Sequence, residues 1–202
     1  MNGKRIFVAL TGASGSVYGL RLVEQLCLRG FQVTFCTSSS GGEVCREETG
    51  LDLSGDLAKA AVRLREHLEI DGGVEMVHPD DLFSPAASGS AAPDAMVVCP
   101  CSMGTLARIA AGISGNLIER CADVMLKEHR PLLLVPRETP LSDIHLENML
   151  RLSRSGARIV PAMPAFYARP ETVIDLVDFV VGKTLDQLGI EHALFKRWGE
   201  DR

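Results

Sequence analysis

Short apolar runs alternate with longer amphipathic segments along the whole of this 202-residue chain. The apolar runs predict six strands, at Arg5–Leu10, Phe31–Cys36, Val74–Val77, Ala95–Cys99, Pro131–Val135 and Ala157–Val160. Several of them are almost continuous in Val, Leu and Ile, which is typical of strands buried on both faces of a parallel sheet. The alternation therefore predicts a three-layer α/β fold, with helices covering both faces of that sheet.

Two amphipathic segments give the clearest helix predictions. Apolar residues recur at helical spacing from Val17 to Cys27, and Gly30 follows as a stop signal, so the first two strands and this helix form one strand–helix–strand unit. A second apolar stripe runs from Val173 to Leu188. The small residues of 84–93 (SPAASGSAAP) predict either a slack connection or a mobile flap beside a ligand. We expect one domain over residues 1–202, with a flavodoxin-like (Rossmann-like) sheet.

Composition narrows the class of protein. The chain is 46% hydrophobic and 23% charged with a net charge of −5, and its charges are interspersed, so a nucleic-acid surface is not expected. No apolar stretch is long enough for a membrane helix or a signal peptide, so we expect a cytoplasmic protein. The six cysteines then read as reduced thiols, and Cys99 and Cys101 have no second pair at zinc spacing, so no metal site is expected.

Polar groups follow five of the six expected strands. The first strand is followed by TGASG (11–15), the second by TSSS (37–40), the fourth by PCSMGT (100–105), the fifth by Arg137 and Glu138, and the last by PAMPAFYARP (161–170). Hydroxyls and free N–H groups at helix starts bind phosphates and the polar edge of a flavin. Each serine taken singly is equally explained as a helix N-cap. Together they predict a ligand crevice at the carboxyl edge of the sheet.

The first of these turns differs from a dinucleotide fingerprint. It carries Gly12 and Gly15 without a third glycine at the usual spacing, and the second strand ends in Cys36-Thr37-Ser38 rather than in an acidic residue. An NAD site needs that acidic side chain for the ribose hydroxyls. The turn therefore favours a mononucleotide such as FMN over NAD.

Longer motifs carry a family resemblance. TGASG, ASGS before VVCPCSMGTLA, LKEHRPLLLVPRETP, PAFYARP and RWGE together make the chain resemble the UbiX-type flavin prenyltransferases, once described as aromatic-acid decarboxylase subunits, from Arg5 to about Glu200. The resemblance implies metal-free transfer of the dimethylallyl group of dimethylallyl monophosphate to nitrogen 5 and carbon 6 of reduced FMN. It also implies a UbiD-type decarboxylase as the functional partner that uses the product, and large homo-oligomers, typically dodecamers, with active sites between subunits. The sequence leaves open whether the donor is the monophosphate or the diphosphate.

The resemblance also implies roles for individual residues. FMN is expected to contact Gly12, Ala13, Ser14, Ser38, Ser102, Met103, Gly104, Thr105 and Arg137. The allylic phosphate is expected near Ser88, Gly89, Ser90, Arg120, Lys127, Tyr167 and Lys183. Lys127, Arg137 and Lys183 can gather the charge of the departing phosphate. Glu138, with Ser14 beside it, is expected to handle the proton lost when the second bond to the flavin forms.

Three residues, Glu48, Lys183 and Trp198, carry expectations of their own. Glu48 is a second carboxylate expected in the same polar cluster as Glu138. Lys183 stands where many relatives have Arg, and Lys cannot make the same bidentate phosphate contact. Trp198 either packs on the domain or a neighbouring subunit, or shelters the allyl group.

Two rival functions stay open on the residues. An FMN-dependent cysteine decarboxylase should carry a P-A-S-A-N-T turn, but this chain reads PCSMGT there. A non-catalytic FMN carrier would use the same crevice residues. The phosphate-directed cations and Glu138 argue against the carrier, because storing a flavin does not require them.

Overall fold

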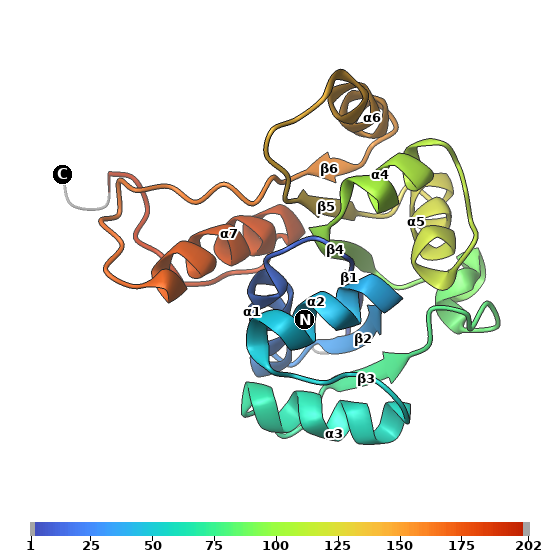
Figure 1. Cartoon of the computed structure of the whole chain (residues 1–202), viewed down its shortest axis with the longest axis horizontal. Coiled ribbons are helices and arrows are strands. Elements are labelled where there is room, and N and C mark those ends of the chain that lie inside the picture. The colour runs from blue at the N-terminus through green and yellow to red at the C-terminus, as the bar shows by residue number, and fades with distance from the viewer. Residues whose placement is uncertain (1–2, 200–202) are drawn as a thin grey trace.

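A six-stranded parallel sheet forms the centre of the computed structural model, which describes residues 3–199 (Figure 1). The strands are β1 (Arg5–Leu10), β2 (Gln32–Thr37), β3 (Val74–Val77), β4 (Ala95–Cys101), β5 (Leu132–Pro136) and β6 (Arg158–Ile159). Their order is β3-β2-β1-β4-β5-β6, and every neighbouring pair is parallel. This is the five-stranded flavodoxin-like order with one strand, β3, added beside β2. The predicted fold class is therefore confirmed.

Helices cover both faces of this sheet. They are α1 (Ser16–Leu28), α2 (Ser39–Thr49), α3 (Leu57–Leu68), α4 (Met103–Ala110), α5 (Leu117–Lys127), α6 (Asp143–Arg154) and α7 (Val173–Leu188). One apolar core joins the sheet to α1, α3 and α7, and a second joins its other face to α4, α5 and α6. Side chains of β1 alternate between the two: Val8 faces the first core and Phe7 the second, both fully buried. Burial on both faces explains why the strands are so uniformly apolar.

The strand ends differ from the prediction by a few residues. The N–H of Phe31 donates to Leu26 O at 3.1 Å, so Phe31 completes the end of α1 and β2 begins one residue later. β4 continues through Pro100 to Cys101, where its pairing with β5 shifts register. β6 keeps only two of the four residues expected, although the N–H groups of Val160 and Ala162 still donate to Leu134 O at 2.8 Å and to Pro136 O at 3.0 Å.

The segment of small residues before β4 is a packed connection rather than a slack one. It forms two short 3-10 turns, η1 (Pro85–Ala87) and η2 (Gly89–Ala91), beside α5. Arg120 Nε donates to Ala87 O at 3.1 Å, and Arg130 Nη1 donates to Ala92 O at 2.7 Å. These two arginines thus tie the segment to α5 and to the residues that lead into β5.

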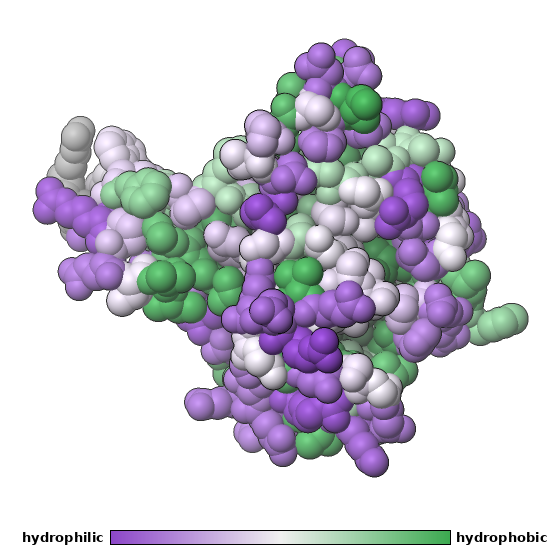
Figure 2. Space-filling model, in the orientation of Figure 1, coloured by the Kyte–Doolittle hydropathy of each residue, from purple (hydrophilic) through white to green (hydrophobic). Residues whose placement is uncertain are grey.

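Residues 160–172 form an arm that leaves the sheet after β6, reaches outward and returns as α7 (Figure 1). Apolar side chains are exposed at this end of the molecule, among them Phe166, Val173 and Trp198, and Figure 2 shows apolar surface gathered there. A projecting apolar surface of this kind marks an interaction site. None of the helices within residues 3–199 is long and apolar enough to cross a membrane.

Candidate functional site

Thr11 joins the turn after β1 to the turn after β4. Its fully buried hydroxyl donates to Pro100 O at 2.9 Å and accepts from the N–H of Ser102 at 2.8 Å. These two strands are neighbours at the point where the chain order reverses, which is where open α/β sheets bind their ligands. Thr11 is not among the site residues predicted from the sequence, although its place directly before Gly12 was a signal.

Glycines let the chain segments around this point approach one another closely. A Cβ on Gly12 would lie 2.4 Å from Ser40 Oγ, and one on Gly19 would lie 2.2 Å from the carbonyl oxygen of Cys99. Close helix–strand packing is the role of the third glycine in a dinucleotide fingerprint. Here Gly19, inside α1, allows this close packing. It lies four residues after Gly15 rather than three, so a third functional glycine does follow the turn.

Ser38 and Ser102 are helix N-caps whose hydroxyls face the crevice edge. Ser38 Oγ accepts from the N–H of Gly41 at 3.0 Å and starts α2, and Ser102 Oγ accepts from the N–H of Thr105 at 3.3 Å and starts α4. The capping interpretation is therefore correct for both. Capping and ligand binding are compatible, because the neighbouring helix N–H groups attract an anion, while the Ser102 hydroxyl itself donates to Thr105 Oγ1 at 3.0 Å.

The start of α1 is capped in another way, by Glu48 from α2. The N-cap position is Gly15, which has no side chain, and the Glu48 carboxylate accepts from the N–H groups of Gly15 at 3.0 Å and Ser16 at 2.8 Å. Partial burial acts to raise the pKa of Glu48, but the hydroxyl of Ser14 and these two N–H groups outweigh it and lower that pKa. The Glu48 carboxylate already occupies the start of α1. A bound phosphate is therefore expected at the starts of α2 and α4 instead.

Arg137 reaches the same turn from β5. Its Nε donates to the carbonyl oxygen of Ser14 at 3.0 Å. The next residue, Glu138, is half-buried, and its Oε1 accepts from the N–H of Thr139 at 3.1 Å. The structure thus brings together Ser14, Glu48 and Arg137, with Glu138 beside them in the chain. No hydrogen bond or ion pair joins Glu138 to Ser14 directly.

Most of the residues expected near the allylic phosphate form a second group. Ser88 Oγ and Ser90 Oγ are 3.1 Å apart, and a Cβ on Gly89 would lie 2.9 Å from Lys127 Nζ. Lys127 forms an ion pair with its neighbour Glu128. Arg120 holds the same segment through Ala87 O. Two hydroxyls, the Lys127 ammonium and the Glu128 carboxylate therefore meet around Gly89, and the atoms nearest to an added Cβ there belong to the Lys127 and Glu128 side chains.

This second group lies at the opposite edge of the sheet from the flavin turns. Residues 88–90 precede β4 and Lys127 precedes β5, whereas Ser102 follows β4. The seven residues of β4 span about 20 Å. One chain therefore does not bring the two groups together.

Tyr167 and Lys183 lie in a third place, on the arm and on α7. Tyr167 packs edge-to-face on Phe179 and on Trp198, with ring centroids 5.9 and 5.2 Å apart, so Trp198 packs within its own chain. Lys183 Nζ lies 3.7 Å from the carboxylate of Asp186. The predicted phosphate residues are thus divided between two parts of the chain.

The cysteines take no part in these groups as nucleophiles. Burial raises the pKa of Cys36 and of Cys101 to about 12, so both thiols stay protonated at neutral pH. Among residues 3–199, no three His, Cys, Asp or Glu side chains are arranged to hold a metal ion.

Comparisons with known proteins point to one family. The family model described as Flavoprotein matches residues 1–185. The flavin prenyltransferase UbiX of Halalkalibacterium halodurans is 54% identical over 96% of this chain and 93% of its own length. AnUbiX (PadA1), solved in complex with FMN and dimethylallyl pyrophosphate, superposes with a TM-score of 0.87 at 39% identity over 97% of both chains. A dodecameric FMN-dependent UbiX-like decarboxylase from Escherichia coli O157:H7 superposes with a TM-score of 0.85 at 42% identity, covering 96% of this chain and 98% of that one.

Proposed function

This chain belongs to the UbiX-type flavin prenyltransferases, and we propose that it joins the dimethylallyl group of dimethylallyl monophosphate to reduced FMN. One observation supports this proposal most directly: the chain carries two separate groups of donors that are suited to an anion. The starts of α2 and α4 form one, and Lys127 with Ser88, Gly89 and Ser90 forms the other. An enzyme that joins two phosphate-bearing molecules needs both, whereas an FMN carrier needs only the first.

The charges around the crevice suggest how FMN is oriented. Because the Glu48 carboxylate occupies the start of α1, the FMN phosphate is expected at Ser38 and Ser102, on the starts of α2 and α4. The flavin ring then extends toward Arg137 and Ser14. The remaining residues of the FMN set, Gly12, Ala13, Met103, Gly104 and Thr105, lie on the turns and helix starts between these ends.

The chain's own residues then divide the work of the reaction. Breaking the allylic C–O bond sends the electron pair to the departing phosphate, whose charge Lys127, Arg120, Tyr167 and Lys183 stabilise. The aromatic rings of Tyr167 and Trp198 favour an allylic cation. Formation of the second bond to the ring releases a proton, which Glu138 accepts with Ser14 beside it. Glu48 acts in the same cluster by fixing the turn that holds Ser14.

The divided groups suggest how the whole site is completed. Residues at opposite edges of one sheet meet only when they come from different subunits, so we propose a homo-oligomer with active sites between chains. We propose that this homo-oligomer is a dodecamer, as the dodecameric relative suggests. We also propose that the chain works as a single domain in the cytoplasm and supplies its product to a UbiD-type decarboxylase.

The decisive experiment is an anaerobic reaction. Purified protein is mixed with chemically reduced FMN and dimethylallyl monophosphate, and the released flavin is analysed by mass and absorption spectrum. We expect the flavin to gain one five-carbon unit. Glu138→Gln should bind FMN as the parent protein does but form no product, because the amide cannot accept the proton, and Ser14→Ala should slow turnover.

The controls separate the proposed function from its rivals. The diphosphate is tested beside the monophosphate, since either donor would give the same product. Flavin that stays unmodified with both donors would favour the carrier. Normal turnover by Glu138→Gln would remove Glu138 from the proposed mechanism without affecting the transferase activity itself.

A further inference from the structure

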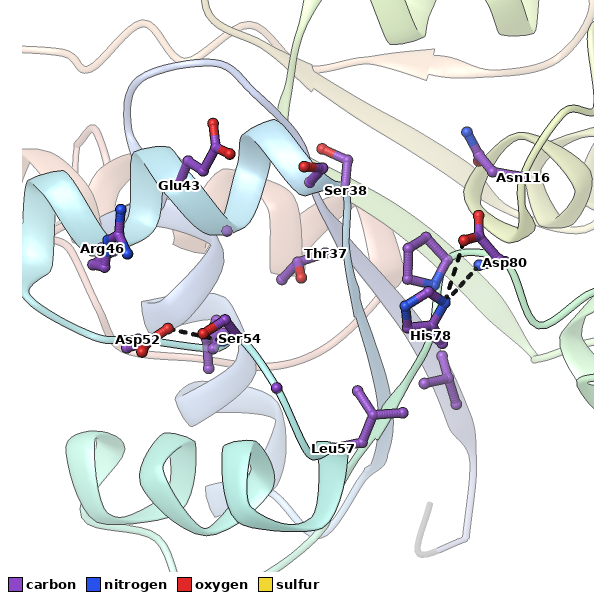
Figure 3. Close-up of a pocket in the computed structure, with 16 residues that line it drawn as sticks. Thr37, Ser38, Glu43, Arg46, Asp52, Ser54, Leu57, His78, Asp80 and Asn116 are labelled. Carbon is purple, nitrogen blue, oxygen red and sulfur yellow. Dashed lines mark hydrogen bonds and ion pairs between the residues drawn. The ribbon is translucent and has the colours of Figure 1, made fainter.

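A pocket of about 540 Å³ opens beside the proposed flavin site, at the carboxyl ends of β2 and β3 (Figure 3). It lies between α2 and the loops that precede α3 and follow β3. Its lining includes Ser38, Arg46, Leu57, Pro79 and Asn116. The size falls within the range of sites that bind small organic ligands.

Ser38 connects this pocket to the flavin site. It lines the pocket and also caps the start of α2, where the FMN phosphate is expected. The flavin ring is expected at the other end of the crevice, toward Arg137. The pocket therefore continues from the phosphate end of FMN, on the side away from the reacting ring.

The strand order suggests what kind of ligand could extend from the flavin site into this pocket. Sheets with the order 3-2-1-4-5-6 are built from two mononucleotide-binding halves and bind dinucleotides across the crevice. The phosphates of a dinucleotide lie near the β1–β4 switch point, with one mononucleotide half over the ends of β1–β3 and the other over the ends of β4–β6. Here the flavin ring, expected toward Arg137 after β5, lies on the second side, and the pocket at the ends of β2 and β3 lies on the first.

The lining has the chemistry that an adenine ring requires. Leu57, Val77 and Pro79 provide an apolar wall at the β3 end of the pocket. Asn116 Oδ1 accepts from the N–H of Glu119 at 3.0 Å and so caps α5, which leaves the amide nitrogen free of any partner within residues 3–199. Figure 3 shows Asn116 at the edge of the pocket, on the side of Asp80. An amide donor at the rim of an apolar wall matches the ring-nitrogen acceptors of adenine.

The other end of the pocket suits a sugar. Glu43 offers a carboxylate that can accept from ribose hydroxyls, and Ser39 adds a hydroxyl, while Asp52 beside them accepts from the N–H of Ser54 at 2.9 Å. Arg46 supplies a positive charge on the same side. The ligand class that combines a phosphate at Ser38, a sugar and a flat heterocycle with ring-nitrogen acceptors is an adenylate.

We propose that this pocket is an adenylate subsite, so that the flavin site binds FAD as well as FMN. The adenine ring lies against Leu57 and Pro79 with its edge on the Asn116 amide, and the flavin half occupies the FMN position. The inference rests on the flavin site of the proposed function, since the pocket adjoins its phosphate end.

Calorimetric titration of the full-length, flavin-free protein with FMN, FAD and AMP tests the subsite. We expect FAD to bind with a dissociation constant within tenfold of that of FMN, and AMP to compete with FAD. Asn116→Asp keeps the cap of α5, because Asp caps as well as Asn, but it replaces the donor by a carboxylate. That variant should weaken FAD and AMP binding at least fivefold and change FMN binding less than twofold.

Two further variants test whether the effect on binding belongs to this pocket. Asn148→Asp makes the same chemical change on α6, outside the pocket, and should change none of the three affinities. Leu57→Trp narrows the apolar wall and should weaken FAD and AMP binding but not FMN binding. The subsite would be wrong if FAD bound more than tenfold more weakly than FMN, or if Asn116→Asp weakened FMN and FAD equally. A protein that binds neither flavin would instead contradict the proposed function itself.

Discussion

Glu48 shows how one side chain sets the charge pattern of the crevice. Its carboxylate caps α1, whose N-cap glycine has no side chain, and favourable hydrogen bonds lower its pKa despite partial burial. A group with a lowered pKa stabilises the folded protein above its unfolded-state pKa, and that contribution is lost as pH falls through the folded-state pKa. Glu48→Gln should therefore lower the thermal unfolding midpoint at pH 7 by about 1–3 °C.

Thermal melts from pH 7 down to pH 3 measure this contribution. The gap between the parent protein and Glu48→Gln should be widest at pH 7 and should close as the pH falls through the lowered pKa of Glu48, where the parent carboxylate also becomes neutral. Glu47→Gln removes an exposed charge from the same helix and serves as the matched control. A gap that persisted unchanged at pH 3 would show that the loss comes from packing and not from charge.

At the scale of elements, the contact between α1 and β4 depends on Gly19. A Cβ there would lie 2.2 Å from the carbonyl oxygen of Cys99, which is backbone inside the sheet and cannot turn away. Gly19→Ala should therefore push α1 off β4 and destabilise the fold by about 1–3 kcal/mol. It should also weaken FMN binding, since α1 carries the turn that is tied to Ser102 through Thr11.

Urea unfolding gives the comparison, with Gly42→Ala as the control. Gly42 also lies inside a helix, but the nearest atom to its added Cβ is Thr37 Oγ1 at 3.8 Å. The helix preference of Ala should there raise stability by up to about 1 kcal/mol. Equal effects of the two substitutions would contradict the close packing assigned to Gly19.

Elements with local signals could be predicted from the sequence, and long-range contacts could not. The strands could be predicted because burial on both faces requires continuous apolar runs. The hydroxyl-bearing turns could be predicted to lie together because the carboxyl ends of parallel strands share one edge of the sheet. The partner of the Thr11 hydroxyl is Pro100, 89 residues away, so no local pattern reveals it. The role of Gly19 was missed because the usual spacing of the fingerprint places the third glycine one residue earlier.

The site residues illustrate the same limit. Motifs identify Lys127 and Glu138 together, because both belong to one run of residues that marks the family. The fold separates them, since α5 ends at one edge of the sheet and β5 ends at the other. The sequence motifs thus predict which residues serve one reaction. They do not reveal that these residues must come from different chains to meet.

At the scale of the whole molecule, this separation predicts that inactive variants rescue one another. Lys127→Ala lacks the cation for the phosphate and Glu138→Gln lacks the proton acceptor, so each homo-oligomer should be inactive. In an oligomer assembled from equal amounts of both, a site between two chains receives an intact Lys127 and an intact Glu138 in one arrangement of four. Co-expressed and co-purified mixtures should therefore recover about a quarter of the parent activity, if subunits assemble at random.

The control for this experiment pairs two variants from one edge of the sheet. Arg120→Ala and Lys127→Ala affect the same group beside residues 88–90, which a single chain contributes as a unit. Every such group in their mixture lacks one of the two cations, so mixing should restore nothing beyond the activity of the single variants. Rescue of Glu138→Gln by Lys127→Ala without rescue within this pair would place the two halves of the site on different chains. If neither mixture recovered activity although mass spectrometry showed mixed oligomers, the two edges would not meet across a subunit boundary, and the arrangement proposed for the active site would be wrong.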